Sequence, residues 1–133
     1  MTTIHRLKKL GLITHRGLYN YEIKKYAKTM KIAYFRDVYD RQNLPAKPFK
    51  YEALILNLDD IDNPGTHWVA LRKIDNIVIY FDSYGDLPPP KEIFQYLNDY
   101  DIYYNHRNYQ NDYSVICGQL CIEFLINTSN INY

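Results

Sequence analysis

The sequence predicts an α+β fold, in which helices flank a small central sheet of mixed or antiparallel strands. Two segments, 20–31 and 117–127, carry apolar residues at helical spacing. Short apolar runs of strand length lie between them, and a tight polar turn separates two of these runs. A length of 133 residues is close to the commonest size of one domain. We therefore expect a single domain, 1–133.

The first predicted helix covers residues 20–31. Its apolar positions recur three and four residues apart, with lysines between them: Ile23, Tyr26, Ala27 and Met30. Asn20 is a suitable N-cap, because its side chain can accept a hydrogen bond from the first turn. Around Pro45 and Pro48 the chain is expected to be extended or irregular.

Three strands are predicted next. The nearly continuous apolar run ALILNL at 53–58 indicates a buried strand. Segments 67–73 and 77–82 indicate two more strands, joined as a hairpin around Asp75 and Asn76. The three consecutive prolines that follow cannot continue a central strand.

The remaining elements are a short helix, a strand and a final helix. Residues 91–98 favour a helix, and DIYYN at 101–105 favours a strand. The last helix, 117–127, has one apolar face, formed by Leu120, Cys121, Phe124 and Leu125.

Charge is divided unevenly along the chain. Residues 1–50 carry twelve Lys and Arg against three acidic residues, a balance of +9, whereas residues 51–133 carry four against twelve, a balance of −8. Such a division can indicate a basic face that meets nucleic acid or an acidic partner. Alternatively, the two parts neutralise each other within one fold.

Composition narrows the class of protein further. No apolar run approaches the roughly 20 residues of a membrane span, and the first residues lack the apolar stretch of a signal peptide. Cys117 and Cys121 are one helical turn apart, so a disulfide between them would close almost no loop. We expect a soluble protein of a reducing compartment, with no membrane, no disulfide and no structural zinc.

Three segments carry residues suited to thiol-dependent acyl transfer: GTHWVAL (65–71), YFDSYG (80–85) and YQNDYSVICGQLCIEFL (109–125). A thiolate nucleophile needs a base, an acid that orients the base, and donors for the oxyanion. His67 is the candidate base and Asp82 the orienting acid. Cys117 is the candidate nucleophile, and Gln110 together with the Cys117 backbone N–H supplies the oxyanion donors.

Spacing brings these residues together independently of any resemblance. Strand alternation places His67 on the face of Val69 and Leu71, and the hairpin turn places Asp82 opposite His67 within about one residue. Cys117 lies at the first turn of the last helix, where backbone amides and the helix dipole favour a thiolate. Gly118 permits a close approach at that turn.

Each residue also has a simpler interpretation. A cysteine on an apolar helix is usually a small buried hydrophobe, which is our interpretation of Cys121. Taken singly, His67 could be a core histidine, Asp82 a turn residue and Trp68 a core aromatic. The combined order of His-Trp, Asp, Gln and Cys-Gly is more specific than any one part. The other histidines, His5, His15 and His106, are expected at the surface.

Over residues 53–126, this order resembles the adenain-like cysteine proteases of DNA viruses and their cellular relatives, the SUMO proteases (clan CE). The seven-residue step from Gln110 to Cys117 and the second cysteine, Cys121, look like adenain, which carries Glu at the position of Asp82. GTHWVAL with YFDSYGDLPPP looks most like the maturation proteases of virophages and Maverick/Polinton elements. The resemblance implies an adenain-like fold and the same four roles for His67, Asp82, Cys117 and Gln110.

The resemblance also implies a function. It suggests a cysteine endopeptidase that cleaves capsid or core precursors of a virus after small residues, chiefly glycine, with Trp68 and Gly118 beside the substrate. No cofactor is required, although a nucleic-acid or peptide activator is expected, with DNA binding through the basic 1–50 part. A monomer in the virion and the host-cell interior, not secreted, is expected. Alternatives are an isopeptidase for ubiquitin-like modifiers, an acetyltransferase, or a catalytically silent scaffold or packaging component.

Overall fold

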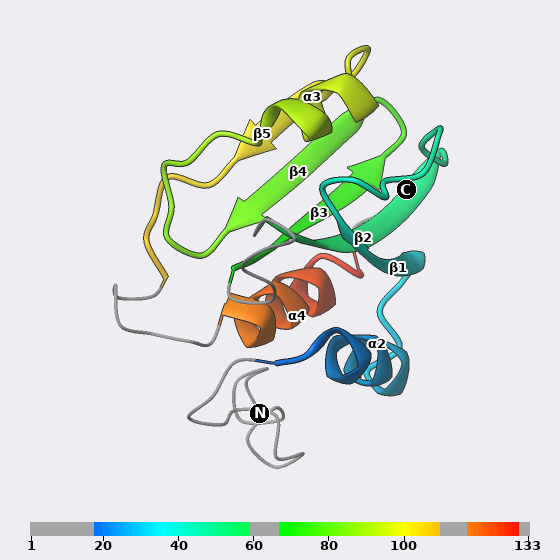
Figure 1. The fold of residues 1–133 in the computed structure, drawn as a ribbon, viewed down its shortest axis with the longest axis vertical. Helices are drawn as coiled ribbons and strands as arrows, with labels where there is room; N and C mark the ends of the chain where they lie inside the picture. The colour runs from blue at the N-terminus through cyan, green and yellow to red at the C-terminus, as the bar shows by residue number, and fades with distance from the viewer. Residues whose placement is uncertain (1–17, 59–66, 110–116, 131–133) are drawn as a thin grey trace.

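The computed structural model describes residues 18–58, 67–109 and 117–130 (Figure 1). Five strands and three helices occur in this part of the chain. In chain order they are α2 (Asn20–Thr29), β1 (Phe35–Asp40), β2 (Tyr51–Asn57), β3 (Trp68–Ile74), β4 (Ile77–Asp82), α3 (Lys91–Tyr96), β5 (Asp101–Tyr104) and α4 (Cys117–Asn127). None of the described helices is long and apolar enough to cross a membrane.

The strands form one open mixed sheet in the order β1-β2-β3-β4-β5. The three central strands are antiparallel neighbours, whereas β1 pairs parallel to β2, and β5 pairs parallel to β4. This architecture confirms the predicted α+β class. It also adds a strand that the sequence analysis did not predict, because β1 (FRDVYD) is polar and has only one buried residue, Val38.

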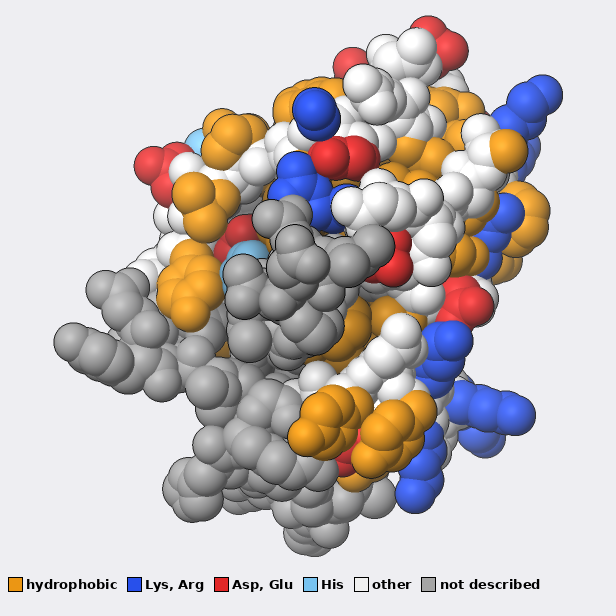
Figure 2. Space-filling model, in the orientation of Figure 1, with side chains coloured by type: hydrophobic (Ala, Val, Ile, Leu, Met, Phe, Trp, Pro, Cys, Tyr) orange, Lys and Arg blue, Asp and Glu red, His pale blue; other side chains and the backbone are white. Residues whose placement is uncertain are grey.

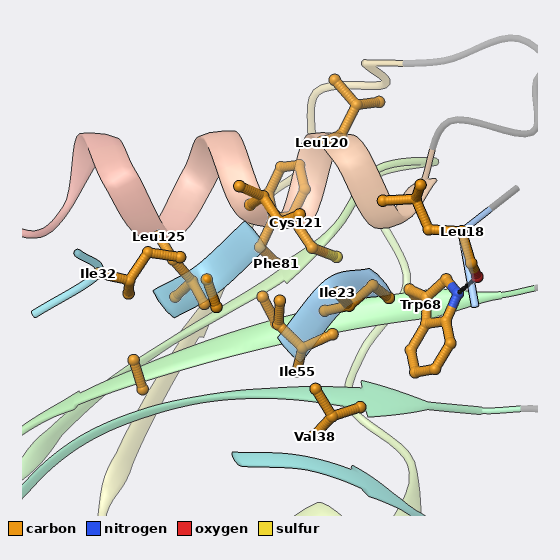
Figure 3. Packing of buried hydrophobic residues seen from close by; sticks show 14 of the residues in the cluster. Leu18, Ile23, Ile32, Val38, Ile55, Trp68, Phe81, Leu120, Cys121 and Leu125 are labelled. Carbon is orange, nitrogen blue, oxygen red and sulfur yellow. Dashed lines mark hydrogen bonds between the residues drawn. The ribbon is translucent and has the colours of Figure 1, made fainter. Parts of the chain in front are cut away.

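Helices cover both faces of the sheet, and two separate cores result. On one face α4 packs against β3 and β4, and α2 packs against β1 and α4 (Figures 1 and 3). Trp68 and Ala70 belong to this core, and Val69 and Leu71 to the other, which contains Ile93 of α3. The alternation predicted for β3 is therefore confirmed.

The ends of several elements differ from the sequence prediction. Asn20 is the first helical residue rather than the N-cap, which is Tyr19, and the Glu22 carboxylate accepts a hydrogen bond from the Tyr19 backbone N–H at 3.0 Å. The helix ends before Lys31, whose positive φ of 52° lets the chain turn away. Strand β3 begins one residue later than expected, at Trp68. Helix α3 is two residues shorter than expected and β5 one residue shorter.

A buried arginine fixes the far end of α4. Arg72 of β3 is fully buried and donates to the Leu125 carbonyl at 2.8 Å and to the Thr128 hydroxyl at 2.8 Å. It also donates to the Ala33 carbonyl at 2.6 Å. A cation near the last carbonyls of a helix interacts favourably with the helix dipole. Arg72 thus holds α4 across β3, and the position of α4 determines where its first residue, Cys117, lies.

Candidate active site

The ends of three secondary-structure elements meet at one corner of the sheet. The start of β3, the end of β4 and the N-terminal end of α4 lie together there (Figure 1). His67 directly precedes β3, Asp82 is the last residue of β4, and Cys117 is the first residue of α4. Three residues that the sequence analysis singled out therefore come from three different elements.

His67 and Asp82 are in direct contact. The His67 Nε2 atom lies 3.0 Å from Asp82 Oδ2. Their offset differs from the prediction, because the partner of Asp82 across the hairpin is Val69, so His67 lies two residues away rather than one. The side chains meet diagonally, within the reach of such neighbours at a strand end. The Asp82 side chain is 3 % exposed and that of His67 is 19 % exposed.

His67 also joins the carboxylate to the thiol. Burial disfavours the charged ring, but hydrogen bonds to the side chains of Asp82 and Cys117 outweigh this effect and raise the pKa of His67 to about 9. Because Nε2 faces Asp82, the other ring nitrogen, Nδ1, is left for the sulfur. The ring is therefore placed to carry a proton at neutral pH between two groups that favour its positive charge.

The surroundings of Cys117 suit an anionic sulfur. The Trp68 backbone N–H donates to Cys117 Sγ at 3.4 Å, and an N–H donor interacts more strongly with a charged acceptor. Cys117 is also the first residue of α4, where helix amides point outward. Both cysteines are buried, Cys117 at 3 % exposure and Cys121 completely, and at Cys121 burial raises the pKa of the thiol. The interpretation of Cys121 as a small buried hydrophobe is confirmed.

Trp68 and Gly118 pack against each other beneath the nucleophile. A Cβ atom on Gly118 would lie 3.2 Å from Trp68 Cδ1 and 3.4 Å from Ile23 Cδ1. Trp68 is buried, and its Nε1 donates to the Leu18 carbonyl at 3.2 Å (Figure 3). The glycine thus permits the close approach expected from the sequence. A contact of either residue with substrate stays a prediction.

Gln110 and the histidines other than His67 are the remaining residues that the sequence singled out. Gln110 lies outside the described residues, as do His5 and His15. His106 is exposed, as expected, and its Nδ1 lies 2.7 Å from Asp86 Oδ1. Within the described ranges, no three His, Cys, Asp or Glu side chains gather as metal ligands.

Sequence reasoning missed two neighbours of the candidate triad. The Tyr84 ring lies 5.2 Å from the His67 ring, and the Tyr84 backbone N–H donates to Asp82 Oδ1 at 3.0 Å. The Asn105 side chain hydrogen-bonds the Asp82 main chain. A signal for Asn105 was present in the sequence, since it is a polar amide at the end of the predicted strand DIYYN. For Tyr84, one of fifteen tyrosines, no distinguishing signal existed.

Two solved structures of the ASFV pS273R protease, one of them of the selenomethionine protein, are similar to this chain. They superpose with TM-scores of 0.60 and 0.57 at 14 % sequence identity, and the likeness covers 90 % of this chain. It covers 61 % and 60 % of those proteases, so this chain spans about three fifths of their length. At the level of sequence, no protein-family model and no curated protein matches. The likeness shows that the two proteins share an α+β fold with an open mixed sheet.

Proposed function

We propose that this protein is a cysteine endopeptidase with Cys117 as nucleophile, His67 as general base and Asp82 as orienting acid. One observation carries the proposal: the His67 ring hydrogen-bonds both the Asp82 carboxylate and the Cys117 side chain. Nucleophilic acyl transfer requires this order of contacts, from carboxylate to imidazole to thiol. The shared fold with a viral protease supports the same reaction class.

In the proposed reaction, the Cys117 sulfur attacks the carbonyl carbon of a peptide bond. The thiol proton, held on His67, passes to the leaving amine as the C–N bond breaks, and a thioester remains on the enzyme. Water, deprotonated by His67, then hydrolyses the thioester and releases a carboxylate. Asp82 keeps the imidazolium oriented throughout and stabilises its charge.

The proposal also covers the donors to the oxyanion and the choice of substrate. We assign the Gln110 side-chain amide and the Cys117 backbone N–H as donors to the developing oxyanion. From the resemblance to the adenain-like proteases, a small residue, chiefly glycine, is proposed before the scissile bond, with Trp68 and Gly118 beside the substrate. The proposed substrates are capsid or core precursors of a virus. A panel of peptides that vary only in the residue before the scissile bond tests this preference, and equal cleavage of bulky variants contradicts it.

Thiol reactivity tests the catalytic assignment without knowledge of the substrate. Iodoacetamide alkylation of Cys117 is measured against pH in the wild type, His67→Ala and Cys121→Ser. We expect rapid alkylation at pH 7, well below the value of about 8.5 at which a free thiol titrates, and at least a tenfold loss in His67→Ala. Cys121→Ser is the matched control and should react like the wild type, because Cys121 is fully buried. Alkylation that is the same without His67 contradicts the proposal.

Cleavage of natural substrates separates the proposal from its nearest alternative. The wild type and Cys117→Ser are incubated with a viral capsid precursor that contains glycine before the expected scissile bonds and with a ubiquitin-like precursor. We expect cleavage of the capsid precursor by the wild type alone. Preferential cleavage of the ubiquitin-like precursor instead assigns the protein to the isopeptidases.

A basic surface on α2 supports the proposal of a DNA activator. Lysine side chains gather over α2 on the face shown in Figure 2. Four exposed lysines, called here the α2 lysines, make up this surface: Lys24, Lys25 and Lys28 within α2, and Lys31 two residues after its end. Some basic residues of the 1–50 part are instead paired with acidic residues of the 51–133 part. Arg36 contacts Glu52 at 3.1 Å, and Arg41 contacts Glu92 at 3.1 Å. The α2 lysines are proposed as phosphate contacts.

A further inference from the structure

One side chain from a neighbouring strand end hydrogen-bonds the main chain of Asp82, which β3 and the Gly85 N–H also hold. Asn105 directly follows β5, and its Oδ1 accepts a hydrogen bond from the Asp82 backbone N–H at 2.9 Å. Its Nδ2 donates to the Asp82 carbonyl at 2.7 Å. The ladder between β4 and β5 ends at the pair Tyr80 and Tyr104. Beyond this pair, the amide supplies the donor and acceptor that a further strand residue would otherwise provide.

Asn105 is itself held in place. Its Nδ2 also donates to the Arg107 carbonyl at 3.0 Å, and its own carbonyl accepts from the Asp86 N–H at 2.9 Å. Close by, the Tyr109 N–H donates to the Ser83 carbonyl at 2.7 Å. Segments 82–86 and 105–109 are therefore joined on both sides of the amide, and a side chain fixed in this way can act as a rigid support.

The position of the Asp82 main chain determines the position of its carboxylate. The two oxygens have separate partners, because Oδ1 accepts from the Tyr84 N–H at 3.0 Å and Oδ2 faces His67 at 3.0 Å. Aspartate has a short side chain, so a shift of its backbone moves the carboxylate by a similar amount. A displacement of about 1 Å can cost a catalytic arrangement roughly a hundredfold in rate.

We infer that Asn105 is a positioning residue for the proposed triad, acting through the main chain of Asp82 to keep its carboxylate in contact with His67. The inference rests on the proposed function for its catalytic meaning. The underlying coupling from Asn105 through Asp82 to His67 can be measured without any turnover.

The test is an NMR pH titration of the His67 ring in the wild type, Asn105→Ala and Asn105→Ser. Loss of the amide loosens the contact between Asp82 and His67, so the titration midpoint should fall by about one pH unit or more. Two titratable groups act on the ring, the Asp82 carboxylate and the Cys117 thiol. Repeating the series in a Cys117→Ser background isolates the contribution of Asp82. The alkylation profile of Cys117 in the cysteine-containing series should move in step with the titration.

The same pH titration includes a control variant at an exposed asparagine. Asn98→Ala alters an exposed asparagine after α3 and should titrate like the wild type. In an Asp82→Asn background, adding Asn105→Ala should leave the midpoint unchanged. A wild-type midpoint in both Asn105 variants overturns the inference even if their melting temperatures fall. If alkylation of Cys117 in the wild type does not depend on His67, the proposed protease function is contradicted. The NMR titration of His67 then still decides whether Asn105 positions Asp82.

Discussion

At the scale of single residues, the protonation state of His67 connects the site to the stability of the fold. Hydrogen bonds to Asp82 and Cys117 raise the pKa of this histidine to about 9 from an ordinary value of 6.5, despite the opposing effect of burial. The folded protein therefore binds this proton more tightly than the unfolded chain does. The resulting stabilisation is complete below about pH 6.5 and is lost as the pH rises through about 9.

This linkage predicts how replacement of His67 changes stability with pH. The wild type should exceed His67→Gln in free energy of unfolding by about 3 kcal/mol more at pH 6 than at pH 10. Urea denaturation between these pH values measures the difference. His106→Gln, which changes an exposed histidine, is the control. If the gap between wild type and His67→Gln stays constant with pH, the proposed charge on the ring in the folded state is wrong.

At the scale of elements, the contact of Arg72 with the end of α4 predicts a large effect on stability. Arg72→Met removes the guanidinium hydrogen bonds to the carbonyls of Leu125 and Ala33, and a hydrogen bond to a charged group contributes about 1.5–3 kcal/mol. We expect a loss of at least about 3 kcal/mol by chemical denaturation. Arg72→Lys should recover little of it, since an ammonium cannot reproduce the planar fork. Lys25→Met, at an exposed position of α2, is the control and should be nearly neutral.

The turn that follows β4 gives a second prediction at this scale. Gly85 has a φ of +78°, and a Cβ there would lie 2.4 Å from the Arg107 carbonyl oxygen. Gly85→Ala should therefore cost about 2 kcal/mol or more in unfolding free energy. Gly118→Ala is the comparison, because its Cβ meets only side chains, the nearest being that of Trp68 at 3.2 Å. Thermal and urea denaturation rank the two variants, and a smaller loss for Gly85→Ala contradicts the turn geometry.

At the scale of the whole molecule, the division of charge along the chain predicts the salt dependence of the proposed DNA binding. A protein that neutralises phosphates releases counterions, so its affinity falls steeply with salt. Binding of short mixed-sequence duplex DNA should weaken at least tenfold between 50 and 200 mM salt, with a log–log slope of about −0.9 per phosphate contacted. Fluorescence anisotropy measures both quantities.

The α2 lysines should account for part of that slope. Replacing Lys24, Lys25, Lys28 and Lys31 by Gln should reduce the slope by about one for each lysine that contacts a phosphate. Replacing Lys91, which lies on α3 outside the basic surface, is the control. Affinity that does not change with salt argues against an electrostatic DNA activator.

Strong local patterns predicted most of the fold. The bounds of β4 and α4 agree with the sequence prediction, because an apolar strand after a tight turn and an amphipathic helix both carry their periodicity in consecutive residues. The edge strand β1 was missed, since its polar residues gain their hydrogen bonds only from β2, a partner that local periodicity cannot reveal. Asn20 was expected as the N-cap, yet Tyr19 is the N-cap, and its backbone N–H donates to the Glu22 carboxylate.

The sequence by itself determined the fold class, the hairpin turn at Asp75 and Asn76 and the candidates His67, Asp82 and Cys117, because residue type, order and spacing are local properties. Only the tertiary structure decided that the three side chains meet, since α4 crosses β3 and is held there by Arg72. It also decided that Asn105 supports Asp82, because an amide after one strand reaches another strand only once the sheet has formed. Contacts between distant segments depend on packing, and no spacing rule along the chain specifies them.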